Sequence, residues 1–127
     1  MTLTLTVLHE NFTIHRLAKH SDIPSSVFSA PIYFIAKTFD EVSIVLPDNI
    51  IIESDTSEPD WRALKVVGPL DFTLTGVLSN IATVLARKKI SIFALSTFDT
   101  DYILVKKDTL PAALAALKSN DYQVIGS

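Results

Sequence analysis

The sequence predicts an α+β protein of the ferredoxin-like class, with the element order βαββαβ, built as a tandem duplication whose N-terminal unit is abbreviated. Three observations lead to this class: a pattern that repeats along the chain, a regular succession of strand-like and helix-like segments in the second half, and a globular composition. The chain has 127 residues, of which 48% are hydrophobic and 20% charged. The repeat divides it into a degenerate unit, residues 1–60, and a complete unit, residues 61–127.

The repeat consists of two blocks that return in the same order. Residues 34–45 return as residues 94–105, and both stretches contain Thr-Phe-Asp. Residues 5–14 return as residues 64–74, with one residue added. Two blocks in the same order indicate duplication rather than chance.

The first half of the complete unit predicts a strand followed by a helix. A β-type segment, Arg62 to Val67, ends at Gly68-Pro69, because proline cannot donate a hydrogen bond to a ladder. Apolar residues then follow at helical spacing: Leu74, Val77, Leu78, Ile81 and Leu85. The basic run 87–89 complements the negative end of this helix, so the segment reads as an amphipathic helix.

The second half of this unit predicts a hairpin, a second helix and a last strand. Residues 90–95 and 102–105 are strand-like and flank the polar turn 96–101. Asp108 or Thr109 can cap a helix that has Pro111 in its first turn. Its buried face would hold Leu110, Leu114 and Leu117. Tyr122 to Ile125 closes the unit, and right-handed crossovers place both helices on one face of an antiparallel four-stranded sheet.

The first unit mirrors this order with parts missing. Residues 3–8 and 12–17 look extended, and residues 24–28 allow at most a short helix. A hairpin is expected from residues 31–37 and 42–46, and one helical turn from residues 47–50. The acidic, turn-rich stretch 53–60 reads as the connection between the units. Trp61 opens the second unit, and burial explains it better than ligand stacking.

Several strand segments are apolar on both alternations, such as residues 32–36 and 90–95. An antiparallel sheet with one solvated face does not tolerate this pattern well, so both faces should be covered. Helices cover one face, and the other face or edge must meet the sister unit or another chain. We therefore expect a self-associating protein, with a homodimer favoured.

Composition excludes several classes of function. The net charge is -3 and the basic residues are scattered, which argues against a nucleic-acid partner. The ferredoxin-like fold does permit RNA binding through aromatic residues such as Phe93, Tyr33 and Phe34, but the negative charge opposes it. There is no cysteine, no apolar run long enough for a membrane span and no signal peptide, so a cytoplasmic location is expected.

Two segments carry a family resemblance. Residues 68–78, Gly-Pro-Leu-Asp-Phe-Thr-Leu-Thr-Gly-Val-Leu, and residues 90–105 closely resemble ACT domains of the CASTOR type. These are relatives of the regulatory ACT domains of aspartate kinases. The resemblance covers residues 61–125, and the first half resembles the degenerate ACT-like unit of small stand-alone proteins. It implies an amino-acid sensor whose units pair side by side or exchange strands, with the ligand at an interface between two units.

A candidate site can also be argued from the residues. A turn that runs into a helix N-terminus offers backbone N–H groups to a carboxylate, and residues 70–76 form such a turn. Asp71 can accept from an ammonium group, Thr73 and Thr75 can add hydroxyl contacts, and Gly76 allows close approach. The mouth of the hairpin can also touch the ligand. The expected ligand-binding residues are Leu70, Asp71, Phe72, Thr73, Thr75, Gly76, Ser96, Thr97 and Asp99.

Plainer readings of the same residues remain open. Asp71 or Thr73 can simply cap the helix, and Gly76 can serve helix-to-sheet packing alone. In the first copy Asn11 stands opposite Asp71 and Arg16 opposite Gly76, so that copy is expected to have lost its site. Arg16 can still act as a carboxylate partner, although an exposed strand arginine is the commoner case.

Metal, cofactor and catalytic signals are weak. Asp99 and Asp101 lack the further ligands of a calcium loop, so an Asx-type turn explains them better. The three histidines have no zinc-site spacing and are expected to be solvated or partly buried. No nucleophile has a recognisable base beside it. We therefore expect no metal, no cofactor and no catalysis.

These expectations converge on a non-enzymatic regulatory protein, an allosteric sensor that binds an amino acid or similar small metabolite. The alternative is a ligand-free structural or interaction module, in which the fold serves dimerisation and the site is vestigial.

Overall fold

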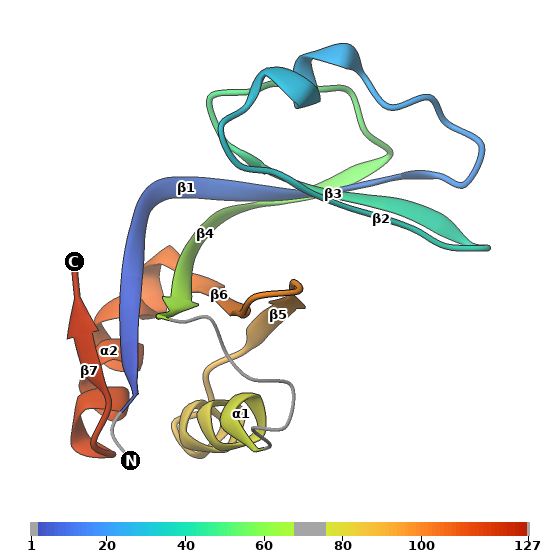
Figure 1. Ribbon diagram of the computed structural model, residues 1–127. Helices are drawn as coiled ribbons and strands as arrows, with labels where there is room; N and C mark the ends of the chain where they lie inside the picture. Colours follow the sequence, from blue (N-terminus) through green and yellow to red (C-terminus); the bar gives the residue numbers. More distant parts are fainter. Residues whose placement is uncertain (1–2, 68–75, 127) are drawn as a thin grey trace. The chain divides into compact units, whose positions relative to one another are not determined.

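The computed structural model describes residues 3–67 and 76–126. It divides the chain into two compact units: unit 1 holds the chain up to His9 and from Arg62 onward, and unit 2 runs from Glu10 to Trp61 (Figure 1). Strands β1 (Thr4–Ala18) and β4 (Thr56–Val66) contribute residues to both units. The start of the first repeat copy thus belongs to the same compact unit as the second copy.

Unit 1 contains nearly all of the unit that the sequence predicts as complete, residues 61–127. It has the predicted order βαββαβ. After β4 come α1 (Val77–Arg87), β5 (Ile92–Ser96), β6 (Asp101–Lys106), the 3₁₀ turn η2 (Lys107–Thr109), α2 (Leu110–Ser119) and β7 (Gln123–Ile125). Thr109 stands at the N-cap of α2, and a proline lies in the first turn, as expected. The described part of α1 begins at Val77, and the earlier helical position Leu74 lies outside the described residues.

The sheet of unit 1 differs from the expected antiparallel sheet of four strands. Its order is β7-β1-β4-β6-β5, so β1 stands between β7 and β4. The pairing of β1 with β7 is parallel, with Thr4 opposite Gln123 and Thr6 opposite Ile125. Leu5 and Val7 explain this insertion, because both side chains are buried, at 0% and 3% exposure. Strand β1 therefore supplies backbone partners to β7 and apolar side chains to the core.

One hydrophobic core lies between the helices and the sheet of unit 1. Both helices pack on the same sheet face, as predicted, and their buried residues include Ile81 and Leu85 of α1 and Leu114 and Leu117 of α2. The strands contribute Leu5, Val7, Leu64, Val66, Ile103 and Val105. Ala63 and Leu104 fall on the opposite alternation and are also buried, at 1% and 0% exposure. Strands β4 and β6 therefore bury residues on both faces, whereas β5 and β7 have no fully buried residue.

Unit 2 contains a four-strand arrangement with a short 3₁₀ helix. Strands β2 (Phe34–Lys37) and β3 (Glu41–Pro47) form the predicted hairpin, and the order is β2-β3-β1-β4. The helix η1 (Ser25–Ser29) is the expected short helix. The expected turn at residues 47–50 is also present, with a hydrogen bond of 3.1 Å from the Ile50 N–H to the Pro47 carbonyl.

Two expectations for this unit are wrong. Strand β1 is one continuous strand rather than two extended segments, and β4 begins at Thr56, inside the stretch expected to be a turn-rich connection. The reason is a pairing partner that composition does not reveal. The Asp55 N–H donates to the Arg16 carbonyl at 2.9 Å, so the acidic stretch meets β1 as it enters β4.

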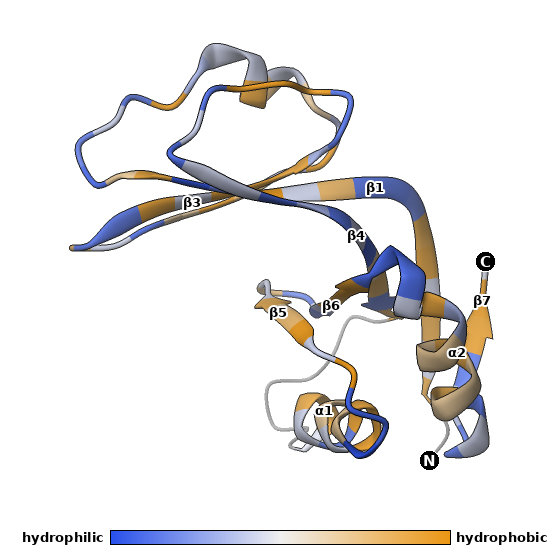
Figure 2. Ribbon diagram, turned by 180° about the vertical axis from the view of Figure 1, so that it is seen from behind, coloured by the Kyte–Doolittle hydropathy of each residue, from blue (hydrophilic) through white to orange (hydrophobic). Residues whose placement is uncertain are grey.

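The core of unit 2 is separate from that of unit 1. It consists of Leu17 of β1, three residues of β3 and two residues of the η1 region, namely Val42, Ile44, Leu46, Val27 and Ala30. In Figure 2 hydrophobic residues follow β3 and recur at η1. No residue is common to the two cores. Trp61 is 9% exposed, in agreement with the expectation of burial.

His15 is buried in unit 2, whereas a solvated or partly buried side chain was expected. It is 6% exposed and lies opposite Ile44 in the ladder. Its Nδ1 is 3.0 Å from the Ser54 hydroxyl, and its Nε2 is buried without a hydrogen-bond partner among the described residues. Burial lowers the pKa of His15, because a charged ring would lose its hydration. Burial therefore favours the neutral imidazole over the charged one.

We predict that the protein loses stability as the pH falls below about 6.5, the usual pKa of histidine. The unfolded chain binds a proton at His15 more readily than the folded chain, so the free energy of unfolding rises with pH across this range. Urea unfolding at about pH 7.5 and about pH 5.5, followed by the fluorescence of Trp61, measures the effect. His15→Gln should reduce the pH dependence, while His9→Gln, at an exposed position, should not. The same pH dependence in both variants would contradict this account.

Candidate functional site

The N-terminus of α1 is the first half of the predicted site. Gly76 occupies the N-cap position with a φ of 83°, in the left-handed region. Its carbonyl accepts the first helical hydrogen bond, from the Asn80 N–H at 2.8 Å. The first N–H groups of α1 have no helical carbonyl to donate to. This end of the helix therefore attracts negative charge.

Gly76 is explained by its backbone conformation rather than by crowding. A Cβ atom built at this position would meet no other heavy atom within 4 Å. Non-glycine residues rarely adopt a left-handed φ, so the turn into the helix favours glycine. No described residue beyond its chain neighbours approaches Gly76 closely, which opposes the reading that it serves helix-to-sheet packing.

Five of the predicted ligand-binding residues lie outside the described residues: Leu70, Asp71, Phe72, Thr73 and Thr75. The N-cap position itself is held by Gly76. The readings of Asp71 and Thr73, as helix caps or as ligand contacts, fall on residues outside the described part of the chain and both stay predictions.

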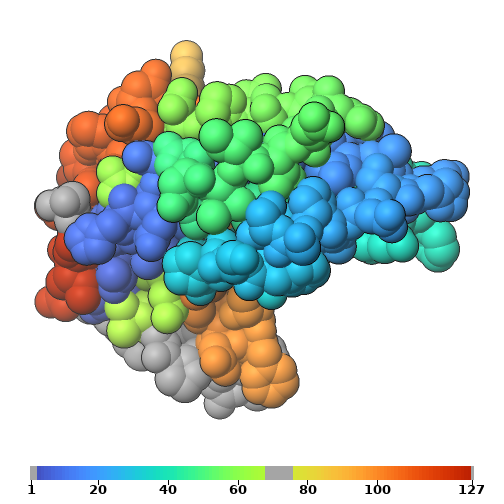
Figure 3. All heavy atoms as spheres, turned by 90° about the horizontal axis from the view of Figure 1, so that it is seen from above, coloured from blue at the N-terminus to red at the C-terminus, as the bar shows by residue number. Residues whose placement is uncertain are grey.

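The β5–β6 hairpin (orange in Figure 3) is the second half of the predicted site, and its turn residues 96–99 are exposed. The Ser96 hydroxyl donates to the Asp101 carboxylate at 2.6 Å. Thr97 closes the turn: its N–H donates to the Thr100 carbonyl at 2.8 Å, and its Oγ1 accepts from the Thr100 N–H at 3.3 Å. Ser96 and Thr97 thus serve the hairpin, whereas the side chain of Asp99 is exposed.

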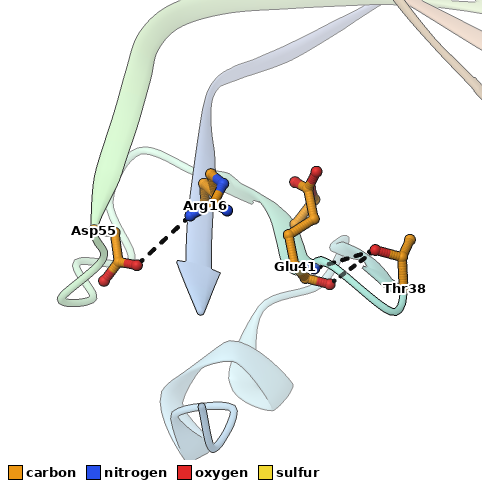
Figure 4. Close-up of polar contacts among 5 residues, drawn as sticks. Arg16, Thr38, Glu41 and Asp55 are labelled. Carbon is orange, nitrogen blue, oxygen red and sulfur yellow. Dashed lines mark hydrogen bonds and ion pairs between the residues drawn. The ribbon is translucent and has the colours of Figure 1, made fainter. Parts of the chain in front are cut away.

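The β2–β3 hairpin in unit 2 carries the same Thr-Phe-Asp motif. Comparing the two hairpins shows that the threonine and the phenylalanine have different roles. Thr38 forms the same turn: its N–H donates to the Glu41 carbonyl at 2.9 Å, and its Oγ1 accepts from the Glu41 N–H at 3.2 Å (Figure 4). In both copies of the motif the threonine therefore serves the fold of the hairpin. Phe39 and Phe98 are instead 95% and 80% exposed.

A side-chain hydrogen bond of Thr100 joins the hairpin to β4, and the sequence analysis did not identify this residue. Its side chain is 5% exposed, and its hydroxyl donates to the Val66 carbonyl at 2.7 Å. Val66 is the last residue of β4, directly ahead of the predicted turn in the sequence. The one signal available was that the fourth position of the motif is Thr100 in one copy and Glu41 in the other.

A polar contact also joins the residue before β7 to helix α1. The Tyr122 hydroxyl donates to the side-chain oxygen of Asn80, in the first turns of α1. Burial raises the pKa of Tyr122, so this hydroxyl stays protonated as a donor. Gly76 and the hairpin residues share no hydrogen bond in the described part of the chain, and the structure does not bring them into direct contact.

Arg16 has a local partner in unit 2. Its guanidinium is 3.7 Å from the Asp55 carboxylate, and both side chains are about half exposed, at 48% and 57% (Figure 4). An exposed ion pair of this kind contributes little to stability. The reading of Arg16 as an exposed strand arginine is therefore supported.

Among residues 3–67 and 76–126, no group of three or more His, Asp or Glu side chains is placed to hold a metal ion. Within the same residues, neither helix is long and apolar enough to cross a membrane.

The sequence of this chain is similar to a known domain family and to named proteins. The sequence profile of the ACT domain matches residues 56–119, half of the chain. The human cytosolic arginine sensor for mTORC1 subunit 1 is 30% identical over 123 residues, which cover 92% of this chain and 37% of the sensor. The mouse protein of the same name is 31% identical over 100 residues, covering 77% of this chain and 30% of its own. The chain thus spans about a third of these relatives' length.

Solved structures give the same picture. Protein Atu0741 of Agobacterium tumefaciens has a TM-score of 0.90 at 29% identity, covering 98% of this chain and 93% of its own. Clostridium acetobutylicum aspartate kinase has a TM-score of 0.69 at 16% identity, covering 92% of this chain and 34% of the kinase. At that identity the likeness concerns the fold alone.

The βαββαβ order, with two helices on one face of the sheet, defines unit 1 as a ferredoxin-like module. Together with the profile match, these features show that the chain belongs to the ACT domain family.

We predict that Gly76→Ala lowers the free energy of unfolding by about 1 to 2 kcal/mol, because alanine is strained at a positive φ. Gly76→Asn should lose less, since asparagine tolerates this conformation and is a good N-cap residue. Urea unfolding of the three proteins checks this order. Equal stability of Gly76→Ala and the wild type would show that the left-handed conformation is not required.

Proposed function

We propose that this protein is a non-enzymatic regulatory sensor that binds an amino acid, or a similarly small metabolite, at an interface between ACT units. The observation that carries the proposal is the alignment of 92% of the chain with a protein named as an arginine sensor. The open left-handed turn at Gly76, at the start of α1, supports a ligand near this helix end. We also propose a cytoplasmic location, in keeping with the cytosolic relative and the absence of cysteine.

The proposed site uses the residues expected from the sequence. Backbone N–H groups at the start of α1 bind the ligand carboxylate, and the helix dipole favours that charge. Asp71 accepts from the ammonium group, and Thr73 and Thr75 add hydroxyl contacts. Leu70 and Phe72 are the other two residues of this segment that we propose to contact the ligand. The hairpin supplies Asp99 together with the Ser96 and Thr97 oxygens, which can still accept a hydrogen bond while their protons are in use.

Regulation follows from a shift of populations. A ligand that contacts two units stabilises the arrangement in which both contacts are made, and it does so only by its difference in affinity between the two arrangements. The surface that a downstream partner meets then depends on ligand concentration.

We predict that one or a few of the twenty amino acids raise the melting temperature of the protein. A ligand present at 100 times its dissociation constant adds about 2.7 kcal/mol to the free energy of unfolding. Thermal melts against each amino acid in turn measure this. A flat result across the set would favour the ligand-free interaction module instead.

Asp71→Asn tests the site within the same experiment. It removes the charge that pairs with the ammonium while keeping the size of the side chain, so the ligand-induced shift should disappear with little change in the melting temperature of the free protein. Asp121→Asn, at an exposed position after α2, is the matched control and should retain the shift.

Strand β5 offers an edge for association of two copies. It is the last strand in the order of unit 1, and its residues are hydrophobic up to Leu95, as Figure 2 shows. It carries no charged residue, which proteins commonly place on edge strands to prevent pairing. We propose a homodimer, in which interfaces between units are completed by the second copy.

We predict a dimer in light scattering, at twice the chain mass of 14.0 kDa. Ala94→Lys places a charge at an exposed position of β5 and should shift the protein toward the monomer. Ala115→Lys, at an exposed position of α2, should leave the dimer intact. A wild-type protein that stays monomeric at high concentration would refute the proposed dimer.

A further inference from the structure

Five of the eleven Lys and Arg side chains of the chain lie at one end of unit 1. The first group follows α1: Arg87 is in its last turn, Lys88 is at its C-cap position, and Lys89 comes next. The second group consists of Lys106, which ends β6, and Lys107, which begins η2. We call these five residues the basic end.

The β5–β6 ladder brings the two groups to the same place. Its last pair is Ile92 opposite Val105, so the first group enters the hairpin where the second group leaves it. Antiparallel partners are about 5 Å apart, which keeps the two chain segments close at this end. Ile90, Val105 and Leu110 adjoin the two groups and are buried in one core. The basic end is therefore a property of the fold and not of a single run of sequence.

The positive charge of the basic end is largely uncompensated. Four of its side chains are exposed and Lys106 is partly buried. Within residues 3–67 and 76–126, the four exposed side chains form no ion pair. Among the described residues, the acidic residue at this end is Asp108, whereas Asp99 and Asp101 lie at the turn of the same hairpin. The whole chain has a net charge of -3, so this is a local excess of positive charge on an acidic protein.

Helix stability explains the first group but not the second. The negative end of the α1 dipole favours Arg87 and the two lysines that follow it. Lys107 instead stands shortly before Leu110, the first residue of α2, where the dipole is positive and opposes a lysine. A binding role for the combined surface accounts for both groups.

We propose that the basic end is a docking surface for an acidic peptide segment of a partner protein. Lysine and arginine form charge-assisted hydrogen bonds with carboxylates, and the planar guanidinium of Arg87 suits a carboxylate with two parallel bonds. Docking here does not require an amino-acid ligand, so it goes beyond the proposed sensor function and names the chemistry of a partner.

A nucleic acid fits this surface less well than an acidic peptide. The phosphate backbone is a long polyanion, and the net charge of -3 opposes its approach outside the basic end. Single-stranded nucleic acids also bind by stacking bases on aromatic side chains. Phe98, which is 80% exposed, lies at the turn of the hairpin, opposite the basic end. A short acidic segment needs only the basic end.

The test is the fluorescence anisotropy of a short labelled peptide of alternating glutamate and glycine, at about 50 mM salt so that screening is weak. Lys107→Glu reverses one charge of the basic end and should weaken binding about tenfold. Glutamate is favoured before α2, so a loss of folding does not explain this result. Lys118→Glu makes the same change at an exposed position in the last turn of α2, and it should bind within about twofold of the wild type.

Asp108→Asn gives a second reading that a folding defect cannot imitate. It removes the acidic residue of this end and should strengthen binding about twofold. Equal weakening in Lys107→Glu and Lys118→Glu would show that only net charge matters and would overturn the docking surface. Equal binding of a peptide with glutamine in place of glutamate would do the same. Tighter binding of a labelled single-stranded oligonucleotide at the same salt would overturn the assignment to an acidic peptide.

Discussion

Strand β7 is three residues long, and its backbone is held by the parallel run of Thr4 to Thr6 in β1. The same segment of β1 places Leu5 and Val7 in the core beneath both helices. Much of unit 1 depends on this pairing, because it positions β7 and completes the core. It also means that β1, and not β4, is the neighbour of β7 in the sheet. Burial of each of these two aliphatic side chains contributes about 1.5 to 3 kcal/mol to the stability of the fold.

The periodicity of apolar residues was sufficient to predict the two helices of unit 1. The positions Val77, Ile81 and Leu85 of α1 and Leu110, Leu114 and Leu117 of α2 repeat at helical spacing, and all of them are buried. The place of β1 beside β7 could not be predicted in this way. Alternation shows that Leu5 and Val7 face a core, but it does not show which core, since pairing between distant strands leaves no local trace.

Unit 2 shows where composition misleads. Residues 56–60 read as a polar connection, yet they begin β4. His15 was expected to be solvated or partly buried, yet it is 6% exposed and burial lowers its pKa. For the site, the sequence indicated the hairpin and Gly76 by residue type, whereas Thr100 was missed because a single hydroxyl has no pattern. Only the distance to the Val66 carbonyl identifies it.

Both β1 and β4 pass through the two compact units, so neither unit is a continuous stretch of chain. This arrangement limits how the protein can be cut or recombined. A fragment that began at Trp61 would contain every element of the ACT order yet lack Leu5 and Val7, and it would leave β7 without its partner. The duplicated copies are therefore not interchangeable modules, and an evolutionary exchange or an engineered fusion must carry the first strand along with the second copy.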